Sequence, residues 1–239
     1  MGIFDFLGGL PILRPLRFQR YPDSFASTRS TLYEKLPAVI KSLLKQNVQL
    51  NHQSNRNLKA PPAAAVFIAA HFPDEFFRLQ NELDQHGIEY QIIMRPLDAQ
   101  WFLDCDAGRP IVYLALAELL TETTFSQNEV HVSKLDLIVV DRHPEPLRDV
   151  ELETFARRFP AMTRMGYFLA LDDRVLRPAI NETTLIVLKQ MGIDEHGLVS
   201  SGIISKRINK VLARKQKLRT VEGLPTDSAE QWFEINDET

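Results

Sequence analysis

An uninterrupted apolar run, Ala63–Ala70, constrains the fold of this chain more than any other feature. The run has the length of a strand, and a strand without polar alternation is typical of a parallel sheet that is buried on both faces. A second run of this kind, Ile111–Ala117, follows. In a chain of 239 residues, 44% of them hydrophobic, such strands have enough partners to build a sizeable core. The sequence therefore predicts an α/β domain.

Strand and helix patterns alternate between residues 63 and 171. We expect strands at Ala63–Ala70, Tyr90–Met94, Ile111–Leu116, Leu135–Val140 and Tyr167–Leu171. Helices are expected at Asp74–His86, Asp98–Cys105 and Leu147–Phe159, and Gly87 is a plausible helix stop. This alternation favours a doubly wound, mainly parallel sheet of about five strands flanked by helices.

The flanking segments have other compositions. Residues 1–25, with three prolines after Leu10, predict an irregular arm, and residues 26–178 form the predicted α/β domain. Within this stretch, helical spacing runs to about Gln46, but Pro37 predicts a kink or two shorter helices. Residues 47–62 are polar and predict a loop. Residues 179–219 predict a helical extension, with helices at Glu182–Met191 and Ser200–Arg219, and residues 220–239 predict a flexible, frayed tail.

Charge and cysteine content exclude several function classes. The net charge of −3 gives no global attraction to nucleic acid or to an anionic membrane. The single cysteine, Cys105, excludes an internal disulfide and a cysteine-based zinc site. No apolar stretch reaches the roughly 18–20 residues of a membrane span, and Met1–Leu10 lacks the basic start of a signal peptide. We expect a cytoplasmic protein without a transmembrane segment; contact of Met1–Leu10 with the inner face of the membrane stays open.

Motifs that bind nucleotides or perform catalysis are missing. The sequence contains no G-x-x-x-x-G-K-[ST], no G-x-G-x-x-G, no G-x-S-x-G and no H-E-x-x-H. Its ten glycines form no loop that could wrap backbone amides around phosphate groups. The sequence therefore predicts no catalytic residues, no cofactor and no metal site.

Polar side chains follow two predicted strands at their carboxyl ends. His71 follows the first strand, and Asp141, Arg142 and His143 follow the fourth. Open α/β sheets place ligand sites at this edge, where an Asp and a His can act as an acid–base pair. The alternative is that these residues, with Asp149, cap the following helix and hold a loop.

Two other charged groups have competing interpretations. Asp172–Asp173 are candidates for a divalent cation, or for the amino end of a helix. The last helix carries Lys206, Arg207, Lys210 and Arg214 without an acid, opposite an apolar stripe that includes Ile203. These cations form either an anion-, RNA- or partner-binding face or a solvated face of a docked helix. Aromatic residues that stack bases are missing from this helix.

The order of segments resembles the second nucleotide-binding half of the SecA preprotein-translocase motor, a RecA-like domain. The strand and helix from Val66 to Leu83 and the stretch Ala107–Ala115 are similar to corresponding stretches of that family. The best block runs from residue 142 to residue 173. In it, the residues identical to the family pattern are Arg142, His143, Asp149, Leu152, Ala156, Arg158, Phe168, Leu169, Leu171 and Asp173. The resemblance implies a RecA-like sheet followed by the start of a helical scaffold.

The chain departs from the family where the chemistry lies. In the arginine-finger motif Q-x-x-G-R-x-G-R, the Gln position is Glu151, the first finger position is Phe155, and only the second arginine remains, as Arg158. The G-R-G-T-D motif falls on Leu119–Thr123 and is gone. The first motor half, with its phosphate loop, is not in the sequence. The resemblance thus implies a degenerate domain.

Three functions follow as hypotheses. The first is a non-catalytic, SecA-like binding or regulatory module that docks on a translocase component or another cytoplasmic protein, with Arg142, His143, Arg158 and the Leu119–Thr123 loop at the interface. The second is half of a composite ATPase completed in trans, with Arg158 as its finger. The third is a helicase-like nucleic-acid binder that uses the basic last helix.

Overall fold

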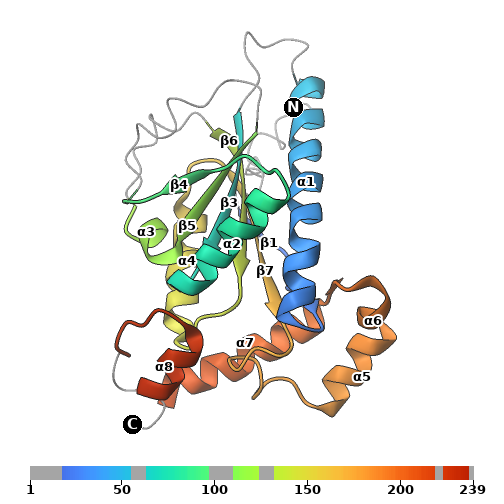
Figure 1. The fold of residues 1–239 in the computed structure, drawn as a ribbon, viewed down its shortest axis with the longest axis vertical. Coiled ribbons are helices and arrows are strands. Elements are labelled where there is room, and N and C mark those ends of the chain that lie inside the picture. Colours follow the sequence, from blue (N-terminus) through green and yellow to red (C-terminus); the bar gives the residue numbers. More distant parts are fainter. Residues whose placement is uncertain (1–17, 55–62, 97–109, 124–131, 219–222, 237–239) are drawn as a thin grey trace, which may run out of the picture.

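The computed structural model describes residues 18–54, 63–96, 110–123, 132–218 and 223–236. Within these residues eight strands form one sheet flanked by helices (Figure 1). The strands are β1 (Phe18–Arg20), β2 (Ser24–Ala26), β3 (Ala63–Ala70), β4 (Gln91–Ile93), β5 (Ile111–Leu116), β6 (Val132–Val140), β7 (Met162–Ala170) and β8 (Val199–Ser200). Their order is β4-β5-β3-β6-β7-β2-β8, and β1 also pairs with β7. Every described pair is parallel except β2 with β8, so the predicted α/β class with a mainly parallel sheet is confirmed.

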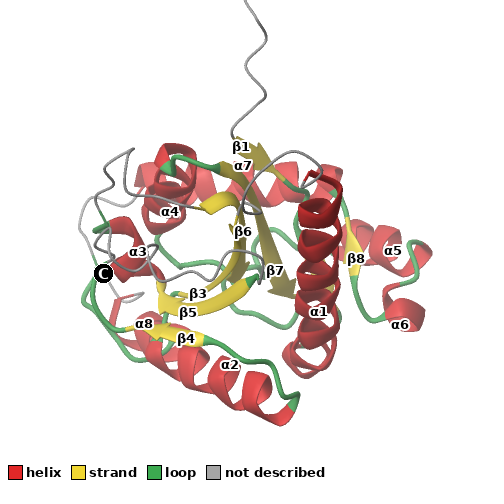
Figure 2. Ribbon diagram, turned by 90° about the horizontal axis from the view of Figure 1, so that it is seen from above, coloured by secondary structure: helices red, strands yellow, loops and turns green. Residues whose placement is uncertain are grey.

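Helices cover both faces of the sheet. On one face lie α1 (Arg29–Ser54) and α2 (Pro73–Gln85), and on the other lie α4 (Pro146–Arg158) and α7 (Gly202–Leu218) (Figure 2). The remaining helices are α3 (Ala117–Thr121), α5 (Glu182–Gln190), α6 (Ile193–His196) and α8 (Ala229–Asn236). No helix in the described ranges is long and apolar enough to cross a membrane.

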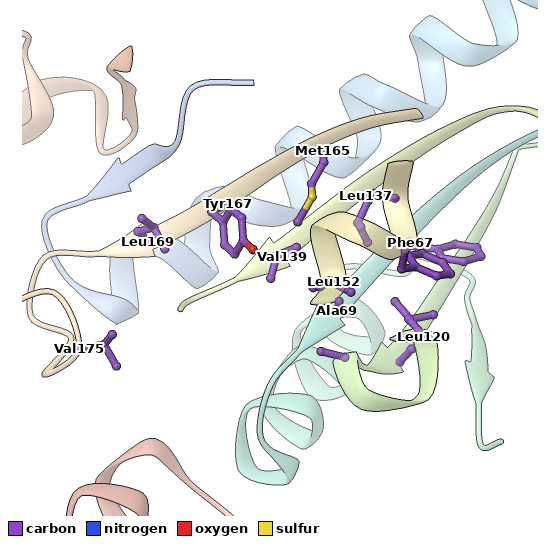
Figure 3. Close-up of a cluster of buried hydrophobic side chains, with 14 of the residues drawn as sticks. Phe67, Ala69, Leu120, Leu137, Val139, Leu152, Met165, Tyr167, Leu169 and Val175 are labelled. Carbon is purple, nitrogen blue, oxygen red and sulfur yellow. The ribbon is translucent and has the colours of Figure 1, made fainter. Parts of the chain in front are cut away.

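The apolar run Ala63–Ala70 is the central strand, β3. Its side chains alternate between the two faces, as the strand period requires. Phe67 and Ala69 join the core under α4, where Leu152 and Phe155 pack (Figure 3). Val66, Ile68 and Ala70 join the core under α2, which supplies Phe76, Leu79 and Leu83. Both faces of β3 are buried, which explains why the run contains no polar residue.

The direction of chain winding reverses next to β3. From β3 the chain passes through α2 towards β4, and from β6 it passes through α4 to β7, on the opposite side of the sheet. The neighbouring strands β3 and β6 therefore form a topological switch point. Open α/β sheets bind ligands in the crevice outside the carboxyl ends of such strands.

Helix α1 corrects two predictions. It continues through Pro37 as one helix, and it extends to Ser54, across the first half of the predicted loop 47–62. The cost of the proline is offset by tertiary packing, since Leu32, Leu36 and Ile40 of this helix are buried against the sheet. Asn47 is also buried, where Lys134 donates to its amide oxygen and its amide group donates to Asp136.

The ends of the chain also differ from expectation. The predicted irregular arm, residues 1–25, contains β1 and most of β2, and the predicted frayed tail, residues 220–239, contains α8. Strand β8 lies within the predicted helical extension and pairs with β2 at the edge of the sheet. These strands have two or three residues each, too few for a periodic pattern, so about five strands were predicted. The predicted loop Leu119–Thr123 is mostly helix α3, and the predicted helix Asp98–Cys105 lies outside the described residues.

Candidate functional site

A pocket of about 1120 Å³ lies at the switch point. Its floor is formed by His71 after β3, Leu116 at the end of β5 and His143 after β6. Its walls come from α3, α4 and the C-terminal segment 223–232. The carboxyl ends of parallel strands meet at one edge, so the sequence prediction that His71 and His143 lie at the same edge is confirmed.

The two histidines are adjacent and held by one carboxylate. Their rings meet edge to face with centroids 5.3 Å apart, and His71 Nε2 lies 2.9 Å from Asp149 Oδ1. The backbone amide of Glu145 donates to His143 Nδ1, so the ring hydrogen of neutral His143 sits on Nε2. Burial and the neighbouring His71 lower the pKa of His143 to about 3. His143 therefore presents an uncharged donor to the pocket at neutral pH.

Arg142 does not reach the pocket, contrary to its prediction as a binding residue. Its guanidinium is buried, donates to Asp23 at 2.9 Å and to Asn209 at 2.9 Å, and lies 3.5 Å above the ring of Tyr167. It also donates to Asp149 at 3.3 Å. Burial opposes the charge of Asp149, but Arg142 and His71 outweigh it and hold the pKa of that carboxyl below its usual range. Arg142 thus links the end of β6 to α4 and α7, which agrees with the alternative that these residues hold the local structure.

Asp141 belongs to a separate cluster on the α1–α2 side. It is the single non-glycine residue with positive φ in the described chain, at 59°, and its backbone amide donates to Phe168 O. Its carboxylate packs with those of Glu75 and Asp173, and Arg29 lies 3.2 Å away. Burial, and then the charges of its neighbours, raise the pKa of Asp141, and the same causes raise that of Asp173 to about 8.

Acidic side chains dominate the pocket. The described lining contains five carboxylates and two guanidinium groups, a net charge of −3: Glu118, Glu122, Glu145, Glu151 and Asp227 against Arg148 and Arg158. Arg148 is paired with Glu151 at 3.3 Å and Glu145 at 3.7 Å. Arg158 lines the pocket and is exposed, and its role in binding stays a prediction. The pocket therefore favours a cationic ligand over an anionic one.

The C-terminal segment closes one wall, and sequence reasoning missed it. The Gly223 amide donates to Glu145 Oε1, and a Cβ at Gly223 would lie 2.8 Å from Trp232 Nε1. Trp232 packs edge to face on His143, with ring centroids 6.1 Å apart. The available signal was a capping box: Ser228 Oγ accepts from Gln231 N three residues on, ahead of the apolar pair Trp232–Phe233.

The basic face predicted on the last helix is only partly free. Lys206, Arg207, Lys210 and Arg214 are exposed along α7, but Arg207 Nε donates to Ala179 O at 3.1 Å. Ile204, Ile208 and Leu212 form the buried stripe. The prediction for Ile203 was wrong, because its side chain is 83% exposed. The helix docks on the domain, and its cations lie away from the switch-point pocket.

The acids considered for a cation serve structural roles. Both carboxylate oxygens of Asp172 accept from the backbone amide of Arg29 at the start of α1, and Asp173 Oδ1 accepts from Val175 N. Among the described residues no group of three or more His, Cys, Asp or Glu side chains could hold a metal ion.

No family model matches the sequence, and no curated protein matches it. Among solved structures, the chain is similar to the C-terminal part of the Fun30 ATPase domain, with a TM-score of 0.37 and 16% identity over 74% of this chain. The chain spans 53% of the length of that protein.

Proposed function

We propose that this chain is a non-catalytic binding module that docks a protein partner at the switch-point pocket. The observation that carries the proposal is the charge of that pocket, a net −3 at the edge where open α/β sheets bind ligands. A nucleoside triphosphate is repelled by such a surface. The sequence resemblance to the SecA family favours a component of protein translocation as the partner.

The surroundings of the residues that match the SecA-family pattern support the same proposal. In the resemblance, Arg142 and Arg158 belong to a nucleotide-handling block, but Arg142 is buried among Asp23, Asp149 and Asn209. Glu151 stands at the position of a polar glutamine and pairs with Arg148. Exposed apolar side chains, Val150 and Leu224, line the pocket instead and offer contact area to a protein.

Site-specific photo-cross-linking tests this proposal. A photoreactive residue at Val150, which is 56% exposed in the pocket, is compared with one at Phe77, which is 59% exposed and does not line it. We expect one specific adduct from Val150 in cells and none from Phe77. Equal labelling from both positions, or no adduct from Val150, contradicts the proposal.

The second candidate is an ATPase completed in trans, which the exposed position of Arg158 favours. Its test adds a first-half motor protein and measures ATP hydrolysis with the native chain and with Arg158→Ala. An arginine finger contributes about 10³–10⁵ in rate, so the variant must abolish stimulation. An unchanged rate excludes this function.

The third candidate, nucleic-acid binding, rests on the exposed Lys206, Lys210 and Arg214 of α7. A salt-titrated gel shift tests it, because phosphate contacts weaken steeply with salt. Lys206→Gln/Lys210→Gln must then reduce both the affinity and the salt slope, and binding that ignores salt excludes the function.

A further inference from the structure

The switch-point pocket has three features, and a peptide is a ligand that can match all three. Its rim is acidic, its exposed walls include the apolar side chains of Val150 and Leu224, and its floor presents the Nε2–H of His143. Each feature specifies one part of a ligand.

The acidic rim specifies a cationic group. Glu118 lies on α3 and Glu122 caps its C-terminus; both are exposed, and neither carboxylate is ion-paired within the described residues. Asp227 lines the same pocket from the C-terminal segment, is exposed, and is likewise unpaired among the described residues. The described lining has one unpaired guanidinium, that of Arg158, against these three unpaired carboxylates, so negative charge is in excess. An incoming lysine or arginine side chain is attracted to these acids.

The buried histidine specifies a hydrogen-bond acceptor. His143 is 9% exposed, its Nδ1 is occupied by the Glu145 amide, and no described residue accepts from its Nε2–H. Because His143 lines the pocket, a ligand carbonyl can accept from this Nε2–H, and such a hydrogen bond contributes a net of roughly 0.5–1.5 kcal/mol. Peptide backbones carry such carbonyls at every residue, whereas polyamines carry none.

On these grounds we propose that the switch-point pocket recognises a short peptide segment of the partner in which a lysine or arginine lies next to an apolar residue. This inference rests on the proposed function and specifies the chemistry of the docking segment. The basic side chain contacts Glu118, Glu122 and Asp227, and the apolar one packs on Val150 and Leu224. A backbone carbonyl between them accepts from His143.

Calorimetry with the full chain tests the inference. The probe is a ten-residue peptide of alternating leucine and arginine, and three comparison probes replace arginine by glutamate, replace leucine by serine, or use spermidine. We expect the leucine–arginine peptide to bind most tightly. Equal binding of spermidine, or binding of the glutamate peptide, overturns the inference.

Matched variants locate the site. Glu118→Gln/Glu122→Gln removes two rim acids, and we expect a loss of about fivefold to tenfold in affinity for the leucine–arginine peptide. The control, Glu89→Gln/Glu234→Gln, makes the same charge change at exposed acids outside the pocket and leaves the affinity unchanged. Arg158→Ala removes a like charge and tightens binding by about twofold to fivefold. Equal losses in both double variants, or weaker binding by Arg158→Ala, overturn the proposal.

The outcomes separate this inference from the proposed function. If no peptide binds but the adduct from Val150 persists, the peptide chemistry is wrong and the protein-binding module stands. If both the peptide binding and the Val150 adduct are missing, both proposals fail.

Discussion

Two neighbouring residues, Asp141 and Arg142, anchor buried ionic clusters that are balanced in opposite ways. On the α4–α7 side, Arg142 stands between the carboxylates of Asp23 and Asp149, and His71 and Arg20 add further donors. On the α1–α2 side, the buried carboxylates of Asp141, Glu75 and Asp173 lie together, and Arg29 forms ion pairs with Asp141 and Asp173. The two clusters have similar burial, so the difference lies in the counter-charge.

The titration behaviour follows this difference. In the Arg142 cluster the pKa of Asp149 is lowered despite its burial. In the Asp141 cluster the pKa values of Asp141, Glu75 and Asp173 are all raised. Carboxylate oxygens of all three residues also lack a hydrogen-bond partner in the described structure. Burial alone therefore does not set the role of a charged group; the number of opposite charges facing it does.

The largest effect is expected for Arg142→Met, which breaks the balanced cluster. The change leaves Asp23 and Asp149 buried without their shared cation, and removes the contact with the Tyr167 ring. We expect a loss of about 3–5 kcal/mol in the free energy of unfolding, measured by urea denaturation at pH 7. A loss below about 1 kcal/mol contradicts the assigned structural role.

A smaller effect of opposite sign is expected for Asp141→Asn. The change removes one of three crowded carboxylates, keeps the shape of the side chain, and places Asn at a positive φ that it tolerates well. Arg29 keeps Asp173 as a partner at 3.5 Å. At pH 8 we expect the free energy of unfolding to rise by about 1–2 kcal/mol, measured by thermal or urea denaturation. A loss as large as that of Arg142→Met removes the contrast between the clusters.

The pH dependence sharpens the comparison further. Asp173 titrates near 3.8 when unfolded and at about 8 when folded, so between these values the folded chain holds a proton that the unfolded chain has released. Its contribution to stability is thus present below about pH 4 and is lost as the pH rises to about 8. We expect Asp173→Asn to reduce this decline by at least about 1 kcal/mol in unfolding curves from pH 5 to pH 9.

His143 provides the opposing slope at acid pH. Its folded pKa of about 3 lies below the ordinary value of 6.5, so the unfolded state gains a proton that the folded state refuses. Stability must therefore fall as the pH drops from about 6.5 towards 3, in both the native chain and Asp173→Asn. A native profile that is flat from pH 4 to pH 9 contradicts both assignments.

The smallest effect is expected for Glu230→Gln on α8. This carboxylate lies 3.6 Å from Arg29 but is 57% exposed, so solvent screens the pair. We expect a change below about 0.5 kcal/mol in the free energy of unfolding at pH 7. A change above about 1 kcal/mol shows that Glu230 belongs energetically to the buried cluster.

Part of this molecule could be predicted from the sequence because it depends on local periodicity. The apolar runs at 63–70 and 111–116 predicted the central strand β3 and its neighbour β5, and the positions of His71 and His143 after strands predicted the edge at which they meet. The carboxyl ends of neighbouring parallel strands lie at the same edge of the sheet whatever the conformation of the loops. This prediction therefore needed no knowledge of tertiary contacts.

Tertiary packing decided the rest. The strands at 18–20, 24–26 and 199–200 are too short for a pattern and exist because β7 and β2 have open edges to pair with. Pro37 is tolerated because its helix is packed on the sheet, and α8 is ordered where Trp232 and Phe233 meet the core. Which of Asp141, Arg142 and His143 is buried, paired or open to the pocket depends on residues distant in sequence, such as Asp23, Glu75 and Trp232. Local sequence does not specify these neighbours, because charges and ring contacts act through space.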